Sequence, residues 1–231
     1  MGGYLNEIQF KGRNCKEAKK WLVEKLPELM KMNFPSDWIN PVSQFFNMPQ
    51  QNLIMITLNV FDPTYQKIEE MMHRTLPHCS IDSVQVLQNI NLWRRFQVEC
   101  EQLEHKLGRK IKTDLLWHRG VSMHKPDQVS KEGFQIVFEN DMWGRAIYFA
   151  NDASYTHNFA TKDNGKLHIF LAEVVLGDSS GKLPKQGLVK PPNKQNTSIE
   201  FDSVSGEDRN SQVFIVYAPQ KCYPRFLVTY H

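Results

Sequence analysis

The chain has 231 residues and a formal net charge of +3 at pH 7, and 41% of its residues are hydrophobic. This composition is that of a globular protein and excludes the disordered class. The small positive charge, with a pI near 8.6, is well short of that of a dedicated nucleic-acid binder. No apolar run reaches membrane-spanning length, and no charged-then-apolar leader opens the chain. Four cysteines without a Cys-x-x-Cys pair favour a reducing compartment, so we expect an intracellular protein, nuclear or cytoplasmic, with no membrane partner.

The first part of the chain differs from the rest. Apolar residues at helical spacing predict a helix over residues 14–32, which Pro27 should kink. Residues 33–51 are rich in Pro, Asn, Gln and Ser and indicate an irregular connector. We therefore predict an N-terminal extension and linker over residues 1–45 and one folded domain over residues 46–231.

That domain should begin with alternating strands and helices. Leu53–Val60 is typical of a strand, and Asp62 and Pro63 should cap and open a helix whose inward side chains include Ile68 and Met72. Residues 83–86 alternate as a strand. An apolar stripe from Leu92 to Leu107 predicts a second helix that ends at Gly108. After residue 115 the chain becomes rich in strands, the longest over residues 167–176, and residues 181–197 indicate a loop.

Two clusters allow a binding interpretation and a simpler one. His73, His78 and Cys79 lack the paired spacing of zinc sites, so we expect no metal. The basic residues between positions 94 and 112 would suit a phosphate or nucleic-acid patch. Glutamates interleave with them, which favours a mixed, solvated helix face, and no nucleic-acid acceptor is indicated.

Three segments of the second half each combine an apolar strand with one polar or aromatic side chain. They are Leu116–His118, Gly144–Ala150 and Val213–Tyr217. Strands are rigid, so they can hold a His and a Tyr against one ligand. In this order the segments resemble the His-Tyr-X signature of the poly(ADP-ribose) polymerase superfamily, the ADP-ribosyltransferases of diphtheria-toxin type, with Val213 at the X position.

Further ordered matches extend the resemblance from about Gln51 to the C-terminus. They include Gly133-Phe134, Pro191-Pro192 and the closing stretch from Tyr223 to Tyr230. The set is similar to the catalytic domain of the macrodomain-containing mono-ADP-ribosyltransferases. This resemblance implies a mixed α/β (α+β) fold of two packed antiparallel sheets with flanking helices and an NAD+ cleft between them.

The resemblance also implies roles for individual residues. His118 would hydrogen-bond the adenosine ribose of NAD+, and Tyr148 would stack on the nicotinamide ring, whose other face Phe159 would cover. Thr156 falls where the family places a Ser that binds the carboxamide, and it supplies the same hydroxyl. His118 and Tyr148 should then lie on adjacent strands and face one cavity, with Phe159 across from Tyr148.

The chain departs from the family where binding depends on the backbone. The family has Gly directly after the His, whereas this chain has Arg119 followed by Gly120, and Ala146 replaces another Gly. Gly permits close approach of a ligand to the backbone. We expect Arg119 and Gly120 to bind the carboxamide through backbone groups, with the Arg119 side chain directed out of the pocket.

The third signature position decides the product. Chain-extending members have a Glu there, which activates the next ribose hydroxyl, and Val213 has no atom that can do so. The resemblance therefore implies transfer of a single ADP-ribose from NAD+ to a protein side chain, with release of nicotinamide. The alternative is an inactive ADP-ribosyltransferase-like domain that serves as a binding module. The sequence does not determine the acceptor residue or the oligomeric state.

Overall fold

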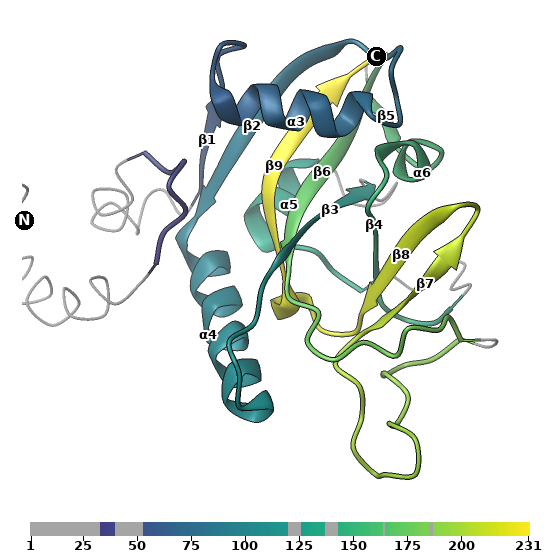
Figure 1. Cartoon of the computed structure of the whole chain (residues 1–231). Helices are drawn as coiled ribbons and strands as arrows, with labels where there is room; N and C mark the ends of the chain where they lie inside the picture. Colours follow the sequence, from purple (N-terminus) through teal and green to yellow (C-terminus); the bar gives the residue numbers. More distant parts are fainter. Residues whose placement is uncertain (1–32, 40–52, 120–125, 137–142, 164, 185–186) are drawn as a thin grey trace, which may run out of the picture.

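The computed structural model describes residues 33–39, 53–119, 126–136, 143–163, 165–184 and 187–231 (Figure 1). Within these residues nine strands form one sheet, and every pair of neighbouring strands is antiparallel. The strand order across the sheet is β1-β2-β9-β6-β3-β4-β8-β7, and β5 pairs with β6. The predicted mixed α/β class, with an antiparallel sheet and flanking helices, is confirmed.

The strands follow the predicted segments closely. They are β1 (Leu53–Thr57), β2 (Ile81–Asn89), β3 (Asp114–Arg119), β4 (Ile147–Ala150), β5 (Thr161–Asp163), β6 (Lys166–Val174), β7 (Val204–Asp208), β8 (Ser211–Val216) and β9 (Cys222–Tyr230). The helices are α3 (Pro63–His73), α4 (Ile90–Leu107), α5 (Pro126–Glu132) and α6 (Ala153–His157), and η2 (Pro219–Lys221) is a single 3-10 turn. No helix in this described part of the chain is long and apolar enough to cross a membrane.

Local signals set the ends of the two long helices. The Asp62 side chain accepts a hydrogen bond from the Thr64 backbone N–H at 2.7 Å, and Pro63 opens α3 without needing a hydrogen-bond partner for its nitrogen. Helix α4 ends at Gly108, whose φ of 63° lies in the left-handed region that glycine adopts at little cost. Both boundaries agree with the prediction.

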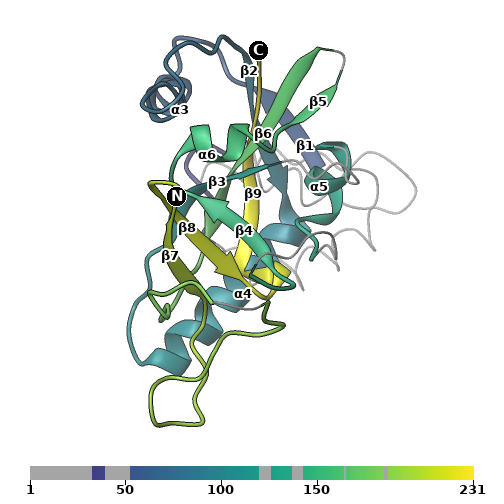
Figure 2. The same cartoon turned by 90° about the vertical axis from the view of Figure 1, so that its right-hand side faces the viewer.

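Helices cover both faces of the sheet (Figures 1 and 2). Helices α3 and α4 bury Ile68, Met72 and Phe96 in a first core cluster with Trp117 of β3. Helix α5 and the segment after it contribute to a second core cluster on the other face; its members include Leu116, Val129, Phe134, Phe149 and Phe170. Apolar side chains on both sides of a strand are what a doubly covered sheet requires.

The sheet has a narrow junction between β3 and β4. Six residue pairs join β3 to β6, whereas the register of β3 with β4 consists of the one pair Trp117 with Ala150. The strands β4, β8 and β7 continue beyond this junction (Figure 1). The two predicted sheets are therefore two halves of one hydrogen-bonded sheet, because β3 and β4 still pair where the halves meet.

Residues 33–39 pack into the first core cluster although they precede the predicted domain boundary. Trp38 is buried, and its ring lies 5.8 Å from that of Trp93 and 6.1 Å from that of Tyr223. Arg225 pairs with Asp37 at 2.7 Å and with Glu173 at 2.6 Å. The predicted helix over residues 14–32 and the boundary near residue 45 lie outside the described residues, so both stay predictions.

Candidate active site

Tyr148 lies in β4, at the outer side of the junction with β3. Its ring is half-buried and packs on a third core cluster that includes Trp143, Ala146, Val213 and Ile215. The Trp143 ring lies 5.9 Å away, and the Tyr148 hydroxyl donates to the carbonyl of Gly144. Packing and this hydrogen bond hold the ring while part of it remains accessible.

Gly144 fixes the position of this segment. Its φ is 118°, and a Cβ on it would lie 1.8 Å from the carbonyl oxygen of Leu188. The close approach lets the chain form two backbone hydrogen bonds, from Arg145 to Leu188 at 2.8 Å and from Leu188 to Trp143 at 3.1 Å. Only glycine combines this φ with such an approach. The loop before β7 is thereby bound to the segment that carries Tyr148.

His118 lies in β3 and is only 6% exposed. Its ring packs edge-on against Phe134, with centroids 4.6 Å apart, and lies 5.2 Å from Phe149. Its Nδ1 is 2.7 Å from the carbonyl oxygen of Tyr148, and since a carbonyl only accepts, Nδ1 carries the hydrogen. Burial is the main cause that lowers the pKa of His118 to about 4, so the ring is neutral at physiological pH.

His118 and Tyr148 lie on adjacent strands, as predicted, but their side chains point to opposite faces of the sheet. Successive residues of a strand alternate between faces. His118 shares its face with Phe149 and the second core cluster, whereas Tyr148, one residue before Phe149, packs on the third cluster. The expectation that both side chains face one cavity stays a prediction. The predicted contact of His118 with the ribose stays a prediction.

Arg119 follows His118 and therefore points to the other face. Its guanidinium carbon lies 5.4 Å from the centroid of the Phe159 ring. Phe159 follows α6 and is 39% exposed, and its ring lies 5.8 Å from that of Tyr155, which packs on the third cluster together with Tyr148. Arg119, Phe159 and Tyr148 thus belong to one side of the sheet. Gly120 lies outside the described residues.

The other two predicted site residues are buried. Thr156 lies in α6, and its hydroxyl is 3.5 Å from the carbonyl of Asp152 in its own helix. Val213 of β8 is fully buried and pairs with Ala150 of β4 on one side and Gly206 of β7 on the other. By alternation it shares a face with Ala150 and Tyr148. No atom of the Val213 side chain can hydrogen-bond, since the side chain carries only carbon and hydrogen.

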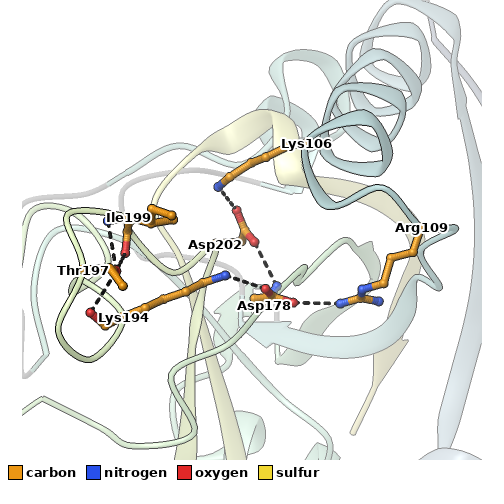
Figure 3. Close-up of polar contacts among 7 residues, drawn as sticks. All are labelled: Lys106, Arg109, Asp178, Lys194, Thr197, Ile199 and Asp202. Carbon is orange, nitrogen blue, oxygen red and sulfur yellow. Dashed lines mark hydrogen bonds and ion pairs between the residues drawn. The ribbon is translucent and has the colours of Figure 1, made fainter.

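An ion-pair network anchors the long loop between β6 and β7 to the end of α4 (Figure 3). Asp202 accepts from Lys106 at 2.5 Å and from the backbone N–H of Asp178 at 2.9 Å. Asp178 in turn accepts from Lys194 at 2.6 Å and from Arg109 at 2.8 Å, and these hydrogen bonds, Lys194 first, lower the pKa of Asp178. Sequence reasoning assigned the basic residues of α4 to a solvated face and missed this network.

We expect Asp202→Asn to lower the free energy of unfolding by about 1 kcal/mol, because Asn keeps the acceptor for Asp178 but loses the charge paired with Lys106. The Asp202 side chain is 2% exposed, which limits screening of the pair. Asp178→Asn is the matched control: its side chain is 33% exposed and its loss should be below about 0.5 kcal/mol. Urea unfolding at low salt measures both, and equal losses would contradict the distinction.

A cavity of about 250 Å³ lies between the start of α4, the end of α5 and η2. Leu92, Phe134, Pro219 and Cys222 are among the residues that line it. No predicted site residue lines it in the described part of the chain. Within those same residues no group of three or more His, Cys, Asp or Glu could hold a metal ion.

Comparisons with known proteins agree on one family. Residues 63–231 match the family described as "Poly(ADP-ribose) polymerase catalytic domain". Protein mono-ADP-ribosyltransferase PARP12 of Mus musculus is 28% identical over 188 residues, which are 79% of this chain and 26% of that protein. Protein mono-ADP-ribosyltransferase PARP14 of Homo sapiens is 26% identical over 208 residues, 87% of this chain and 11% of that protein.

A third relative matches over a larger share of its own length. Protein mono-ADP-ribosyltransferase PARP11 of Homo sapiens is 24% identical over 262 residues, 98% of this chain and 75% of that protein. The chain spans about a quarter of the PARP12 protein and about a tenth of the PARP14 protein. From the family match over residues 63–231 and the antiparallel sheet that carries Tyr148, the chain belongs to the poly(ADP-ribose) polymerase catalytic domain family.

Proposed function

We propose that this chain is an NAD+-dependent mono-ADP-ribosyltransferase that transfers one ADP-ribose unit to a protein side chain. The observation that carries the proposal is the aromatic pair Tyr148 and Phe159. The Tyr148 ring is half-buried and packs on the third core cluster. The Phe159 ring lies on the same side of the sheet and is more exposed. The relatives' printed names, protein mono-ADP-ribosyltransferases, agree with this activity.

The residues present suit a planar cationic ring. The Tyr148 ring cannot swing freely, because its hydroxyl donates to Gly144 and its face packs beside Trp143. A fixed aromatic face attracts a pyridinium through its quadrupole and costs little entropy on binding. In this proposal Tyr148 orients the nicotinamide end of NAD+. His118 supports it from the other face through the hydrogen bond to the Tyr148 carbonyl.

The proposed reaction breaks the bond between C1 of the ribose and the nicotinamide nitrogen. Nicotinamide leaves with the bonding electron pair, and an acceptor carboxylate or thiolate forms the new bond to C1. An ionised acceptor is already nucleophilic, so this step needs no general base from the protein. The protein contributes by orienting the two partners and by stabilising developing positive charge.

The test is transfer from labelled NAD+. We expect the full chain, incubated with labelled NAD+ and a mixture of acceptor proteins, to release nicotinamide and to leave label on protein. NAD+ at about 100 times its dissociation constant should also raise the free energy of unfolding by about 2.7 kcal/mol. Absence of both nicotinamide release and a stability increase would contradict the proposal.

We expect single additions only, because Val213 cannot activate the hydroxyl of a bound ADP-ribose. Val213 is fully buried, and its strand partners are Ala150 of β4 and Gly206 of β7. Intact-protein mass spectrometry should show discrete single units on separate acceptor sites. Long or branched polymer made by the wild-type chain would contradict the role given to Val213.

The second candidate function is that of an inactive module of the same fold, which binds partners without turnover. The burial of His118 favours it, since most of the surface of that histidine contacts Phe134 and Phe149 rather than solvent. NAD+ binding without nicotinamide release, or no binding at all, would support this candidate over the transferase.

A further inference from the structure

Hydrogen bonds hold the walls of the cavity between the start of α4, the end of α5 and η2. The Asn89 Nδ2 donates to the carbonyls of Ser130 and Lys131 at the end of α5, both at 3.0 Å. Its Oδ1 accepts from the N–H of Leu92 in the first turn of α4, at 3.2 Å. One side chain thus joins two walls, so the cavity keeps its shape before any ligand binds.

The cavity, of about 250 Å³, has an apolar floor and a polar rim. Its buried lining residues include Leu92, Phe134 and Cys222. Its exposed lining residues include Arg95, Glu132 and Gln220. A few convergent polar groups beside an apolar surface are typical of small-molecule sites.

Two groups of opposite charge line this cavity and do not pair with each other. Within the described residues the Arg95 guanidinium makes no hydrogen bond, ion pair or ring contact. Glu132 accepts hydrogen bonds from Gln128 at 3.0 Å and from Gln135 at 2.9 Å, both on Oε2. Its Oε1 therefore remains open to a ligand, as does the guanidinium.

This pair of charges selects the kind of ligand. An anion would be attracted by Arg95 and repelled by Glu132, and a cation would meet the reverse. A ligand with one charge of each sign satisfies both groups, and the floor favours an aliphatic part. At about 30 Å³ for each water, the cavity holds roughly eight waters, so it suits a ligand of about that many heavy atoms.

We propose that this cavity binds a small zwitterion with an aliphatic group, of which a free α-amino acid is the simplest. In this arrangement the carboxylate pairs with Arg95, the ammonium pairs with Glu132, and the aliphatic group lies on the floor of the cavity. The site goes beyond the proposed function, because Arg95 and Glu132 have no role in the transfer of ADP-ribose described above.

The experiment measures binding of four probes to the full chain by NMR titration. L-Leucine carries both charges and an aliphatic side chain; isocaproate lacks the ammonium, isoamylamine lacks the carboxylate, and glycine lacks the aliphatic group. The variants are Arg95→Gln and Glu132→Gln, each of which removes one charge. Lys112→Gln, an exposed lysine that does not line the cavity, is the matched control for loss of a positive charge.

We expect leucine to bind the wild-type chain with a Kd of about 1 mM, as a ligand of this size does in a small site. Loss of either charge from the ligand should weaken binding about 3- to 10-fold, because the two protein groups are exposed. Glycine should bind at least about 10-fold more weakly than leucine. Arg95→Gln should no longer distinguish leucine from isoamylamine, and Glu132→Gln should no longer distinguish leucine from isocaproate.

Absence of saturable leucine binding at about 10 mM would overturn the proposal. Variants that keep both preferences, or an equal loss in Lys112→Gln, would overturn it too. Phe134 also packs against His118, so NAD+ is tested as a competitor. Displacement of leucine by NAD+ would assign the cavity to the dinucleotide site and would likewise contradict the proposal.

Leucine binding is measured without NAD+, so the zwitterion site and the proposed function fail separately. A chain that binds leucine as expected but releases no nicotinamide from NAD+ contradicts only the transferase. A chain that transfers ADP-ribose but does not bind leucine contradicts only the zwitterion site. Thermal unfolding of each variant without ligand checks that the fold is intact, because the substituted side chains are exposed.

Discussion

Gly144→Ala should lower the free energy of unfolding by about 4 kcal/mol, the largest effect we expect from any single methyl group in this chain. The added Cβ would lie 1.8 Å from the Leu188 carbonyl oxygen, and the φ of 118° is itself strained for alanine. The backbone must move, and the two hydrogen bonds between residues 143–145 and Leu188 are lost with it, at about 1 kcal/mol each.

Gly181→Ala is the matched control for Gly144→Ala. Its φ of 66° is also positive, but nothing lies within 4 Å of the added Cβ. The control therefore measures the strain of a positive φ alone, about 1 to 2 kcal/mol. Thermal unfolding should show a drop of roughly 8 to 16 °C for Gly144→Ala and a few degrees for Gly181→Ala. Equal drops would contradict the importance of the contact with Leu188.

Gly144→Ala should also reduce NAD+ binding beyond its effect on stability. The Gly144 carbonyl accepts the hydrogen bond from the Tyr148 hydroxyl, so a shift of this residue releases the ring that we assign to nicotinamide. Binding measured well below the unfolding temperature separates the two effects. The loss should be larger for nicotinamide than for ADP-ribose, because ADP-ribose lacks the ring that Tyr148 would orient.

The elements predicted best are those whose signals are local. Asp62 and Pro63 predicted the start of α3, and Gly108 predicted the end of α4. Both predictions were possible because capping depends on residues within one helical turn. The apolar stripe of α4 identified its buried face in the same way. The residues that determine each of these features lie within about twenty positions of one another in the sequence.

The face of the sheet to which the His118 side chain points was predictable in part from the sequence. Alternation alone requires that His118 and Arg119, as neighbours in a strand, point to opposite faces, and likewise Tyr148 and Phe149. The sequence could therefore show that only one of His118 and Arg119 shares a face with Tyr148. Which one does so depends on the register between β3 and β4, and the pair Trp117 with Ala150 joins residues 33 positions apart.

The network at Asp202 and the contact of Gly144 with Leu188 lay beyond sequence reasoning. Lys106 and Asp202 are 96 residues apart in the chain, and Asp178 and Asp202 are 24 apart. Neither pair has a spacing rule, because the loop between β6 and β7 has no regular structure that would fix which residues meet. Charge patterning favours a solvated face for such residues unless the fold brings a buried carboxylate to them.

Acidification should destabilise the protein through His118. The pKa of His118 is lowered to about 4 in the folded state, chiefly by burial, from an ordinary value near 6.5. Between these two values the unfolded chain binds a proton that the folded chain excludes, so stability is present above pH 6.5 and is lost as pH falls towards 4. From pH 7 to pH 5 this one residue should reduce the free energy of unfolding by about 2 kcal/mol.

The variant His118→Gln isolates this contribution. Gln does not titrate, and its amide can donate to the Tyr148 carbonyl as Nδ1–H does. Urea unfolding at pH 7 and pH 5 should therefore show that the wild-type chain loses about 2 kcal/mol relative to His118→Gln. His105→Gln, on the exposed face of α4, is the control and should follow the wild-type chain at both pH values. If His118→Gln also loses stability in parallel with the wild-type chain, His118 is not the buried neutral histidine that the packing of Phe134 and Phe149 around it indicates.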